Sequence, residues 1–134
     1  MRAQLIYKTI NVALAGVFGF VIIYSCLIFP NSKNSVSCYY EQKYGVSCPT
    51  CGVTRAFNSI IKGDLKIATE LNKNSLQLFC FFSFQFLMRL ALVVFNSHVK
   101  SVRALNVLII SDITVSSFLF ILAFRNIVLD ILIQ

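Results

Sequence analysis

The sequence has little charge: 13% of its 134 residues are charged, and only five residues are acidic. A soluble domain carries about 25% charged residues, so this composition excludes a soluble globular protein. A disordered chain is excluded as well, because disorder requires low hydrophobicity. The sequence also has no internal repeat, heptad array or low-complexity segment. With 57% hydrophobic residues and a mean hydropathy of +0.78, it is typical of a small integral membrane protein.

Three apolar runs are long enough to cross a bilayer, which takes about 20 helical residues. They cover approximately residues 10–29, 75–95 and 104–124. Pro30 ends the first run, and Arg125 and Asn126 close the third, before an apolar tail too short to span. No small-residue cleavage site follows the first run, which favours a retained helix over a signal peptide. We therefore expect an all-α protein with one membrane domain over residues 1–134, three transmembrane helices and a long loop over residues 30–74.

Three helices divide the remaining segments between two membrane faces. Face A holds the N-terminus and the loop 96–103, and face B holds the loop 30–74 and the C-terminal tail. The basic residues of face A are Arg2, Lys8, Lys100 and Arg103, and those of face B are Lys33, Lys43, Arg55, Lys62, Lys66, Lys73 and Arg125. Their number favours face B in the cytoplasm, whereas their density in short segments favours face A, so the residues leave the orientation open. Because they are scattered between apolar runs, we expect anionic lipid headgroups as partners and no nucleic acid.

Two charges lie inside the apolar runs, Arg89 in the second and Asp112 in the third. Both lie about 10–12 Å below face A at the usual helical rise, on neighbouring helices of an antiparallel hairpin. A lone charge in the bilayer core is costly, so such charges usually pair. We expect an Arg89–Asp112 ion pair, either as a structural lock of the hairpin or as part of a polar path.

Cysteines gather in the long loop, at Cys38, Cys48 and Cys51. Cys26 and Cys80 lie just beneath the same face, whereas the single histidine, His98, lies on face A. This topology excludes a Cys–His nucleophilic pair and a Cys–His metal site.

Three uses of these cysteines remain open. The Cys-Pro-x-Cys-Gly knuckle resembles half a zinc ribbon, with Cys38, Cys48 and Cys51 as possible zinc ligands and a fourth ligand still required. A Cys-x-x-Cys pair at a helix start suits thiol–disulfide exchange by Cys48 and Cys51, although the βαβ context of thioredoxin folds is absent. A structural disulfide from Cys38 to Cys48 or Cys51 requires face B to lie outside the cytoplasm.

Two short amphipathic helices are predicted after the knuckle. Val53, Ala56, Phe57, Ile60 and Ile61 form one helical stripe, Gly63 suits the position after the helix, and Asp64 suits the cap of a second helix carrying Leu65, Ala68 and Leu71. These helices either lie on the membrane surface or cover the ends of the bundle.

Thr54 and Arg55 stand near the start of the first short helix. Backbone N–H groups and a guanidinium there suit an anion such as a lipid phosphate. An ion pair of Arg55 with Glu41, Asp64 or Glu70 is the alternative.

The stretch Cys48-Pro49-Thr50-Cys51-Gly52-Val53-Thr54-Arg55-Ala56, followed by Gly63-Asp64, Ala68 and Asn72, resembles a family of small bacterial membrane proteins, domain of unknown function 2752. Lys73 stands where members commonly have proline, and Arg125-Asn126 resembles the Arg-Asn after their last helix. The resemblance implies a multi-pass membrane protein of this size and no particular activity. Members often have a basic loop between the last two helices, which implies face A in the cytoplasm of a bacterial inner membrane and the cysteine loop outside.

These patterns support three function hypotheses. The leading one is a non-enzymatic accessory or scaffold subunit, with a membrane-protein partner or a second copy, whose cysteine loop is a structural disulfide or zinc node. The second is a membrane thiol–disulfide oxidoreductase using Cys48 and Cys51. The third is a transporter or proton-path component built on Arg89 and Asp112.

Overall fold

The computed structural model describes residues 2–27, 42–43, 45, 50–99 and 101–133. Its helices are α1 (Arg2–Leu27), α3 (Val53–Ile61), α4 (Leu65–Leu71), α5 (Ser75–His98) and α6 (Val102–Ile133). No strand occurs within these described ranges. The predicted all-α fold is confirmed.

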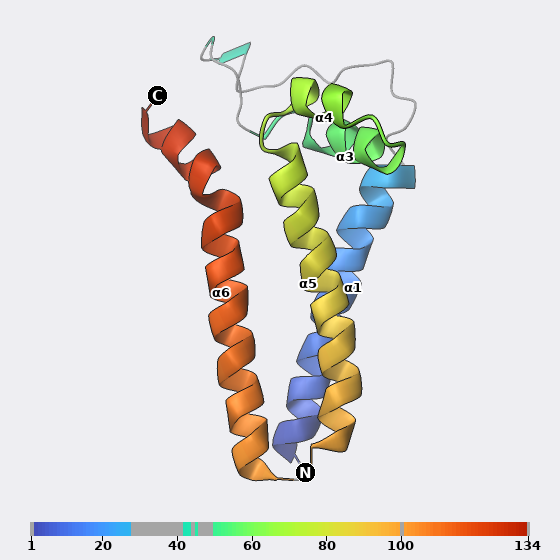
Figure 1. Cartoon of the computed structure of the whole chain (residues 1–134), viewed down its shortest axis with the longest axis vertical. Helices are drawn as coiled ribbons and strands as arrows, with labels where there is room; N and C mark the ends of the chain where they lie inside the picture. Colours follow the sequence, from blue (N-terminus) through green and yellow to red (C-terminus); the bar gives the residue numbers. More distant parts are fainter. Residues whose placement is uncertain (1, 28–41, 44, 46–49, 100, 134) are drawn as a thin grey trace.

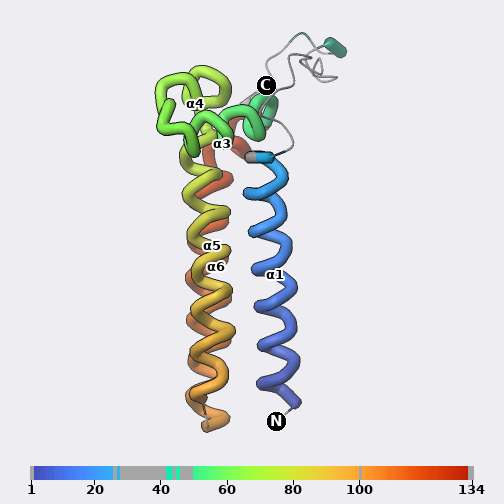
Figure 2. Tube along the Cα trace, turned by 90° about the vertical axis from the view of Figure 1, so that its right-hand side faces the viewer, coloured from blue at the N-terminus to red at the C-terminus, as the bar shows by residue number. Residues whose placement is uncertain are grey.

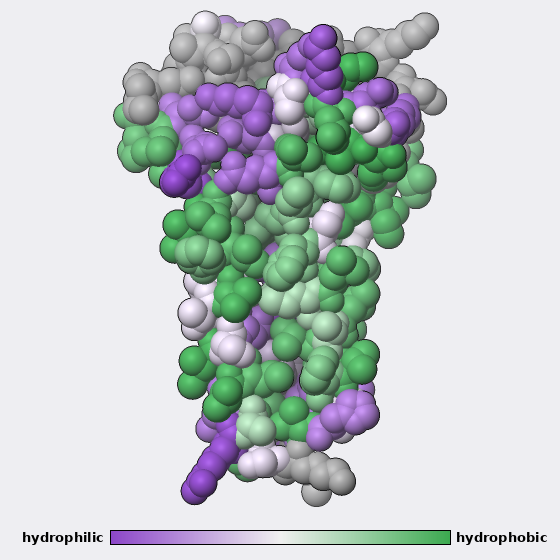
Figure 3. Space-filling model, in the orientation of Figure 1, coloured by the Kyte–Doolittle hydropathy of each residue, from purple (hydrophilic) through white to green (hydrophobic). Residues whose placement is uncertain are grey.

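Three of the helices, α1, α5 and α6, are long and apolar enough to cross a membrane. They run lengthwise through the molecule (Figure 1). Hydrophobic residues cover the middle of the face seen in Figure 3, and hydrophilic residues gather toward its two ends. The described N-terminus and the α5–α6 turn lie at one end, face A, while α3, α4 and the end of α6 lie at the other, face B (Figure 1).

The long helices extend beyond the apolar runs that predict them. Helix α1 begins at Arg2 rather than near residue 10, and α6 continues to Ile133 through Arg125 and Asn126, which the sequence places at its end. Hydropathy marks where a helix enters lipid, whereas a helix ends where its backbone hydrogen bonds stop. Neither extension contains the proline or glycine that would stop them. Asn126, inside the extended part of α6, donates its side-chain amide to Gln77 Oε1 of α5 at 3.2 Å.

Helix α1 packs along α5 through aromatic and small residues. The Phe18 ring meets the rings of Phe81 and Phe82 edge-on, with centroids 6.2 and 5.9 Å away. Gly19 lies so close to Phe86 that a Cβ added to Gly19 would stand 2.9 Å from the Phe86 ring. At face A, Asn96 donates its amide to the Gln4 carbonyl at 3.0 Å, and Gln4 donates to the Val99 carbonyl. These contacts hold α1 and α5 side by side (Figure 2).

Residues 50–74, which we call the cap, lie over the face-B ends of α1 and α5 (Figures 1 and 2). Phe57 of α3 is buried against Leu78 of α5 and Ile127 of α6, with Phe79 and Phe82 around it. The prediction of two short helices is confirmed, and they cover the ends of the bundle. Asp64 takes the predicted N-cap position of α4, although its side chain makes no capping hydrogen bond.

Candidate functional site

Gly52 allows the two helices of the cap to meet. It is the residue before α3, and its φ of +82° lies in the left-handed region that favours glycine. A Cβ at this position would stand 2.7 Å from the carbonyl oxygen of Leu71, the last residue of α4. Any other residue here would be strained by the positive φ, and its Cβ would clash with the Leu71 carbonyl. The start of α3 and the end of α4 can therefore approach this closely only because residue 52 is glycine.

Asn72 joins the same two points by hydrogen bonds. Its side-chain amide donates to the Cys51 carbonyl at 3.0 Å, and its Oδ1 accepts from the Asn74 backbone N–H at 2.8 Å. The side chain is largely buried, at 8% exposure. One amide therefore connects the residue before Gly52 with the turn that leads from α4 into α5.

Two small residues make the interior of the cap. Ala56 and Ala68 are 0% and 1% exposed, so larger side chains do not fit without rearrangement. The hydroxyl of Ser75, the first residue of α5, donates to the Ala68 carbonyl at 3.0 Å. Gly63 supplies the turn between α3 and α4, with a φ of +88°. The small and polar residues that follow the knuckle therefore stabilise the packing of α3, α4 and the start of α5 against one another.

The cysteines are only partly described. Cys51 is disulfide-bonded, and its partner is not among the described side chains. Cys38 and Cys48 lie outside the described residues, so their predicted role in the node stays a prediction. Cys80 is a free, exposed cysteine on α5. Within the described ranges, no three His, Cys, Asp or Glu side chains gather as a metal site. A zinc site at Cys38, Cys48 and Cys51 stays a prediction.

Thr54 and Arg55 lie in the first turn of α3, as predicted from the sequence. The Arg55 side chain is exposed. Neither Asp64 nor Glu70, the described acids of the cap, forms an ion pair with it, while Glu41 lies outside the described residues. An anion contact at Thr54 and Arg55 stays a prediction.

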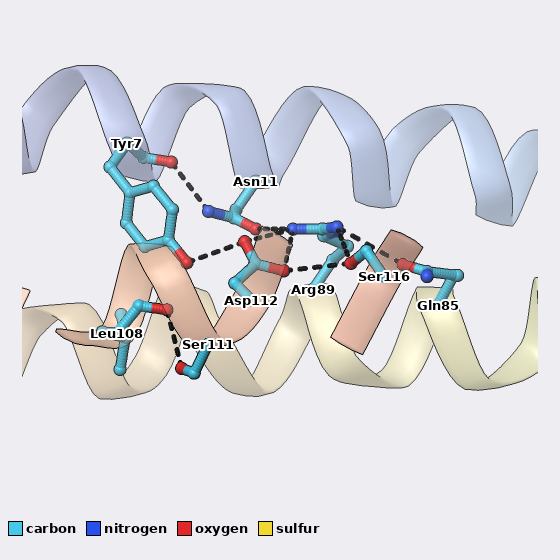
Figure 4. A network of polar contacts seen from close by, with 8 residues as sticks. All are labelled: Tyr7, Asn11, Gln85, Arg89, Leu108, Ser111, Asp112 and Ser116. Atoms are coloured by element: carbon cyan, nitrogen blue, oxygen red, sulfur yellow. Dashed lines mark hydrogen bonds and ion pairs between the residues drawn. The ribbon is translucent and has the colours of Figure 1, made fainter. Parts of the chain in front are cut away.

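Arg89 and Asp112 meet inside the membrane-spanning region (Figure 4). Arg89 Nη1 donates to the two Asp112 carboxylate oxygens at 2.8 and 2.7 Å, and both side chains are more than nine-tenths buried. The structure therefore brings together the two residues that the sequence pairs. Helices α5 and α6 are joined at one depth, as a hairpin lock requires.

Helix α1 completes this cluster with two residues that the sequence analysis missed. The Tyr7 hydroxyl donates to Asp112 Oδ2 at 2.9 Å, and Arg89 Nη1 donates to Asn11 Oδ1 at 2.8 Å. Ser116 accepts from Arg89 Nη2 at 2.8 Å. The available signal was the i, i+4 spacing of Tyr7 and Asn11 on one face of the first helix.

A polar contact away from the Arg89–Asp112 cluster joins the cap to α6. Lys73 Nζ pairs with Asp130 at 2.9 Å across an exposed position. Gln77 of α5 donates to the Leu122 carbonyl of α6 and accepts from Asn126. Helices α5 and α6 are therefore connected by polar groups at two depths, near Arg89 and near the cap.

Residues 38–86 match the family described as Protein of unknown function (DUF2752). No curated protein and no solved structure matches the chain.

The DUF2752 match confirms the predicted resemblance. It extends from Cys38 through the cap into α5. The cap contacts of Gly52, Ala56, Ala68 and Asn72 all lie within it, whereas Arg89 and Asp112 lie outside. The family description assigns no activity.

Proposed function

We propose that this protein is a non-enzymatic accessory or scaffold subunit of a membrane assembly, and that the cap with its cysteine loop is a structural node. The observation behind it is that the small and polar residues of the DUF2752 signature make contacts within the cap and with the start of α5. Gly52 meets Leu71, Asn72 donates to Cys51, and Ala68 accepts from Ser75. An active site directs such groups toward a substrate, whereas here they hold two helices on the bundle.

The disulfide at Cys51 supports the disulfide form of the node over the zinc form. Zinc binds thiolates, and a disulfide-bonded Cys51 has no thiolate to offer. Disulfides persist outside the cytoplasm, which supports a bacterial inner-membrane protein with its cysteine loop on the outer side. Face A, with the N-terminus, would then lie in the cytoplasm.

Anionic lipid headgroups suit the outer edge of the cap as partners. Ile61, Leu65 and Ile67 are about half exposed, and Lys62 and Lys66 are exposed beside them. Apolar side chains beside lysines are typical of a segment at the lipid–water boundary. In this position the cap rests on the membrane and leaves its upper surface for a partner or a second copy.

The Arg89–Asp112 cluster fits a hairpin lock better than a proton path. Its charges are bonded to each other and to Tyr7, Asn11 and Ser116. Ser111 and Thr114 are the polar side chains of α6 next to Asp112 that could extend a proton path. They instead donate to carbonyls of their own helix. Polar side chains between transmembrane helices most often serve association.

Replacing the cysteines with serine tests the structural node. We expect Cys48→Ser and Cys51→Ser each to lower the amount of folded protein in the membrane, because each weakens the cap. The matched control is Cys80→Ser, which removes a free, exposed cysteine and leaves the level unchanged. If the Cys48 and Cys51 variants accumulate normally but lose dithiol exchange with a small disulfide substrate, the protein is an oxidoreductase instead.

A further inference from the structure

A groove of about 480 Å³ runs along the membrane-spanning parts of α1 and α5, and we call it the α1–α5 groove. Its lining on α1 extends from Val12 to Ile23, and its lining on α5 consists of Phe86, Leu90 and Val93. All of these lining residues are apolar. Among the described residues they come from α1 and α5 alone, so the groove opens toward lipid on a side that α6 does not line.

Gly16 gives the groove its depth. A Cβ added to Gly16 would meet nothing within 4 Å, whereas a Cβ added to Gly19 would stand 2.9 Å from the Phe86 ring. Gly19 therefore serves the packing of α1 on α5, and Gly16 does not. The space beside Gly16 lets a group from outside the chain approach the α1 backbone closely.

The α1–α5 groove has the length and the depth of one lipid leaflet. Val12 and Ile23 are eleven residues apart, which is about 16 Å along a helix. Half of the hydrocarbon core of a bilayer is about 15 Å thick. The apolar run of α1 begins near residue 10, so the groove starts just inside the face-A boundary and follows the acyl chains of the face-A leaflet.

A lysine stands at the face-A end of the groove. Lys8 lies one helical turn before Val12 and shares a helix face with Val12 and Ala15. Its side chain is exposed, and among the described residues it forms no ion pair. The face-A segments, residues 1–9 and 96–103, contain four lysines and arginines and no acid. A negative group at this end of the groove would therefore meet cations and no competing carboxylate.

The shape of the groove favours a lipid chain over a docked helix. Close helix packing in membranes uses small residues one turn apart. Ala15 and Gly19 have this spacing, but both are buried within the chain. Phe20 and Ile23 are 65% and 57% exposed and stand beside the groove, where they would hold a helix backbone away. A thin acyl chain needs only the gap beside Gly16.

We propose that the α1–α5 groove binds an anionic phospholipid of the face-A leaflet. One acyl chain lies in the groove over Gly16, and the phosphate-bearing headgroup lies beside Lys8. Basic residues at the mouth of a gap between transmembrane helices are typical of sites for anionic lipids. The site is separate from the cap, so the proposal stands or fails independently of the cap's role.

The test is native mass spectrometry of the detergent-solubilised full-length protein, titrated with phosphatidylglycerol and, separately, with phosphatidylcholine. We expect saturable binding of phosphatidylglycerol, about fivefold tighter than that of phosphatidylcholine, because one lysine beside the headgroup favours the anionic lipid. Equal binding of the two lipids would indicate an ordinary lipid shell and would overturn the proposal.

Two variants locate the lipid, each with a matched control. Gly16→Leu fills the groove, so we expect it to weaken the binding of both lipids about tenfold or more. Ala13→Leu adds the same kind of side chain at an exposed position of α1 outside the groove, and it keeps the native affinity. Lys8→Gln should abolish the preference for phosphatidylglycerol, whereas Arg103→Gln on α6 should keep it.

Three further results would overturn the proposal. Unchanged lipid binding by Gly16→Leu would place the acyl chain elsewhere, and an unchanged preference of Lys8→Gln would place the headgroup elsewhere. A native particle of two chains that Gly16→Leu converts to one chain would mean that a second copy occupies the groove.

Discussion

At the scale of single residues, Gly52 and Gly63 provide a comparison within one cap. Both have positive φ, of +82° and +88°. A Cβ on Gly52 would meet the Leu71 carbonyl, whereas a Cβ on Gly63 would meet nothing within 4 Å. Substitutions at these two positions therefore distinguish the cost of a positive φ from the cost of a steric clash.

We predict that Gly52→Ala lowers the free energy of unfolding by about 2 kcal/mol or more, and Gly63→Ala by about 1 kcal/mol. Only the first adds a clash with backbone to the strain of a positive φ. Thermal or denaturant unfolding in detergent measures both. Equal losses of unfolding free energy would show that a Cβ at residue 52 does not clash with the Leu71 carbonyl.

The intramembrane cluster supports a second prediction at this scale. Asp112→Ala should lower the free energy of unfolding by about 3–5 kcal/mol, because it leaves a buried arginine without its counter-charge. Tyr7→Phe should lower it by only about 0.6 kcal/mol, a usual value for one hydrogen bond between transmembrane helices. Unfolding in mixed micelles measures the difference.

The two losses of unfolding free energy, for Asp112→Ala and Tyr7→Phe, are compared as a ratio. A small effect of Asp112→Ala would mean that Arg89 finds other partners or reaches water.

At the scale of elements, Phe57 of the cap is buried against the bundle, at 1% exposure. We predict that Phe57→Ala loosens the cap with a loss of about 3–5 kcal/mol, seen as faster limited proteolysis of residues 53–71. Phe95→Ala is the control, because Phe95 is 63% exposed and lies near the other end of α5. Unchanged proteolysis of Phe57→Ala would mean that other contacts hold the cap.

The charge exchange Arg89→Asp with Asp112→Arg tests the pairing of α5 with α6. We expect the protein level to recover relative to either single exchange, because the double variant restores opposite charges at one depth. Recovered function of the assembly would indicate a simple lock. A normal protein level without function would favour the path hypothesis.

Sequence patterns predict the elements better than the contacts between them. The three long helices follow from apolar runs, and α3 and α4 follow from a helical stripe interrupted by Gly63 and Asp64. The ends of α1 and α6 were misplaced because hydropathy does not report where backbone hydrogen bonding stops. The Gly52–Leu71 contact joins positions on two helices, and nothing in their spacing specifies how those helices cross.

The candidate site was predictable in part for a similar reason. Arg89 and Asp112 stand out because charge is rare in a membrane span, and their equal depth follows from the short loop between α5 and α6. Tyr7 and Asn11 do not stand out, because a tyrosine and an asparagine are unremarkable near the end of an apolar run. Their role depends on how α1 is rotated against α5, which is set by side-chain packing.

At the scale of the whole molecule, three spanning helices place the two ends of the chain on opposite sides of the membrane. We predict that reporters fused to the N- and C-termini give opposite topology signals, with the N-terminus in the cytoplasm. The same side for both reporters would require two or four spans.

The intact mass of the denatured protein tests the disulfide at the same scale. We expect a mass lower by two hydrogens than that of the reduced chain, restored by a reductant. A native mass raised by one zinc and lost on denaturation would instead establish the metal node and favour the cysteine loop in the cytoplasm.

Helix α6 is attached to its neighbours by polar groups at two levels, one at Arg89 and one at Gln77 and Lys73. A groove lined by Phe18, Phe81 and Phe120 lies between these levels. The section of α6 beside the groove can bow outward while both sets of polar contacts stay intact. The width of the groove would therefore depend on the bending stiffness of this section, and so on the thickness and lateral pressure of the surrounding lipid.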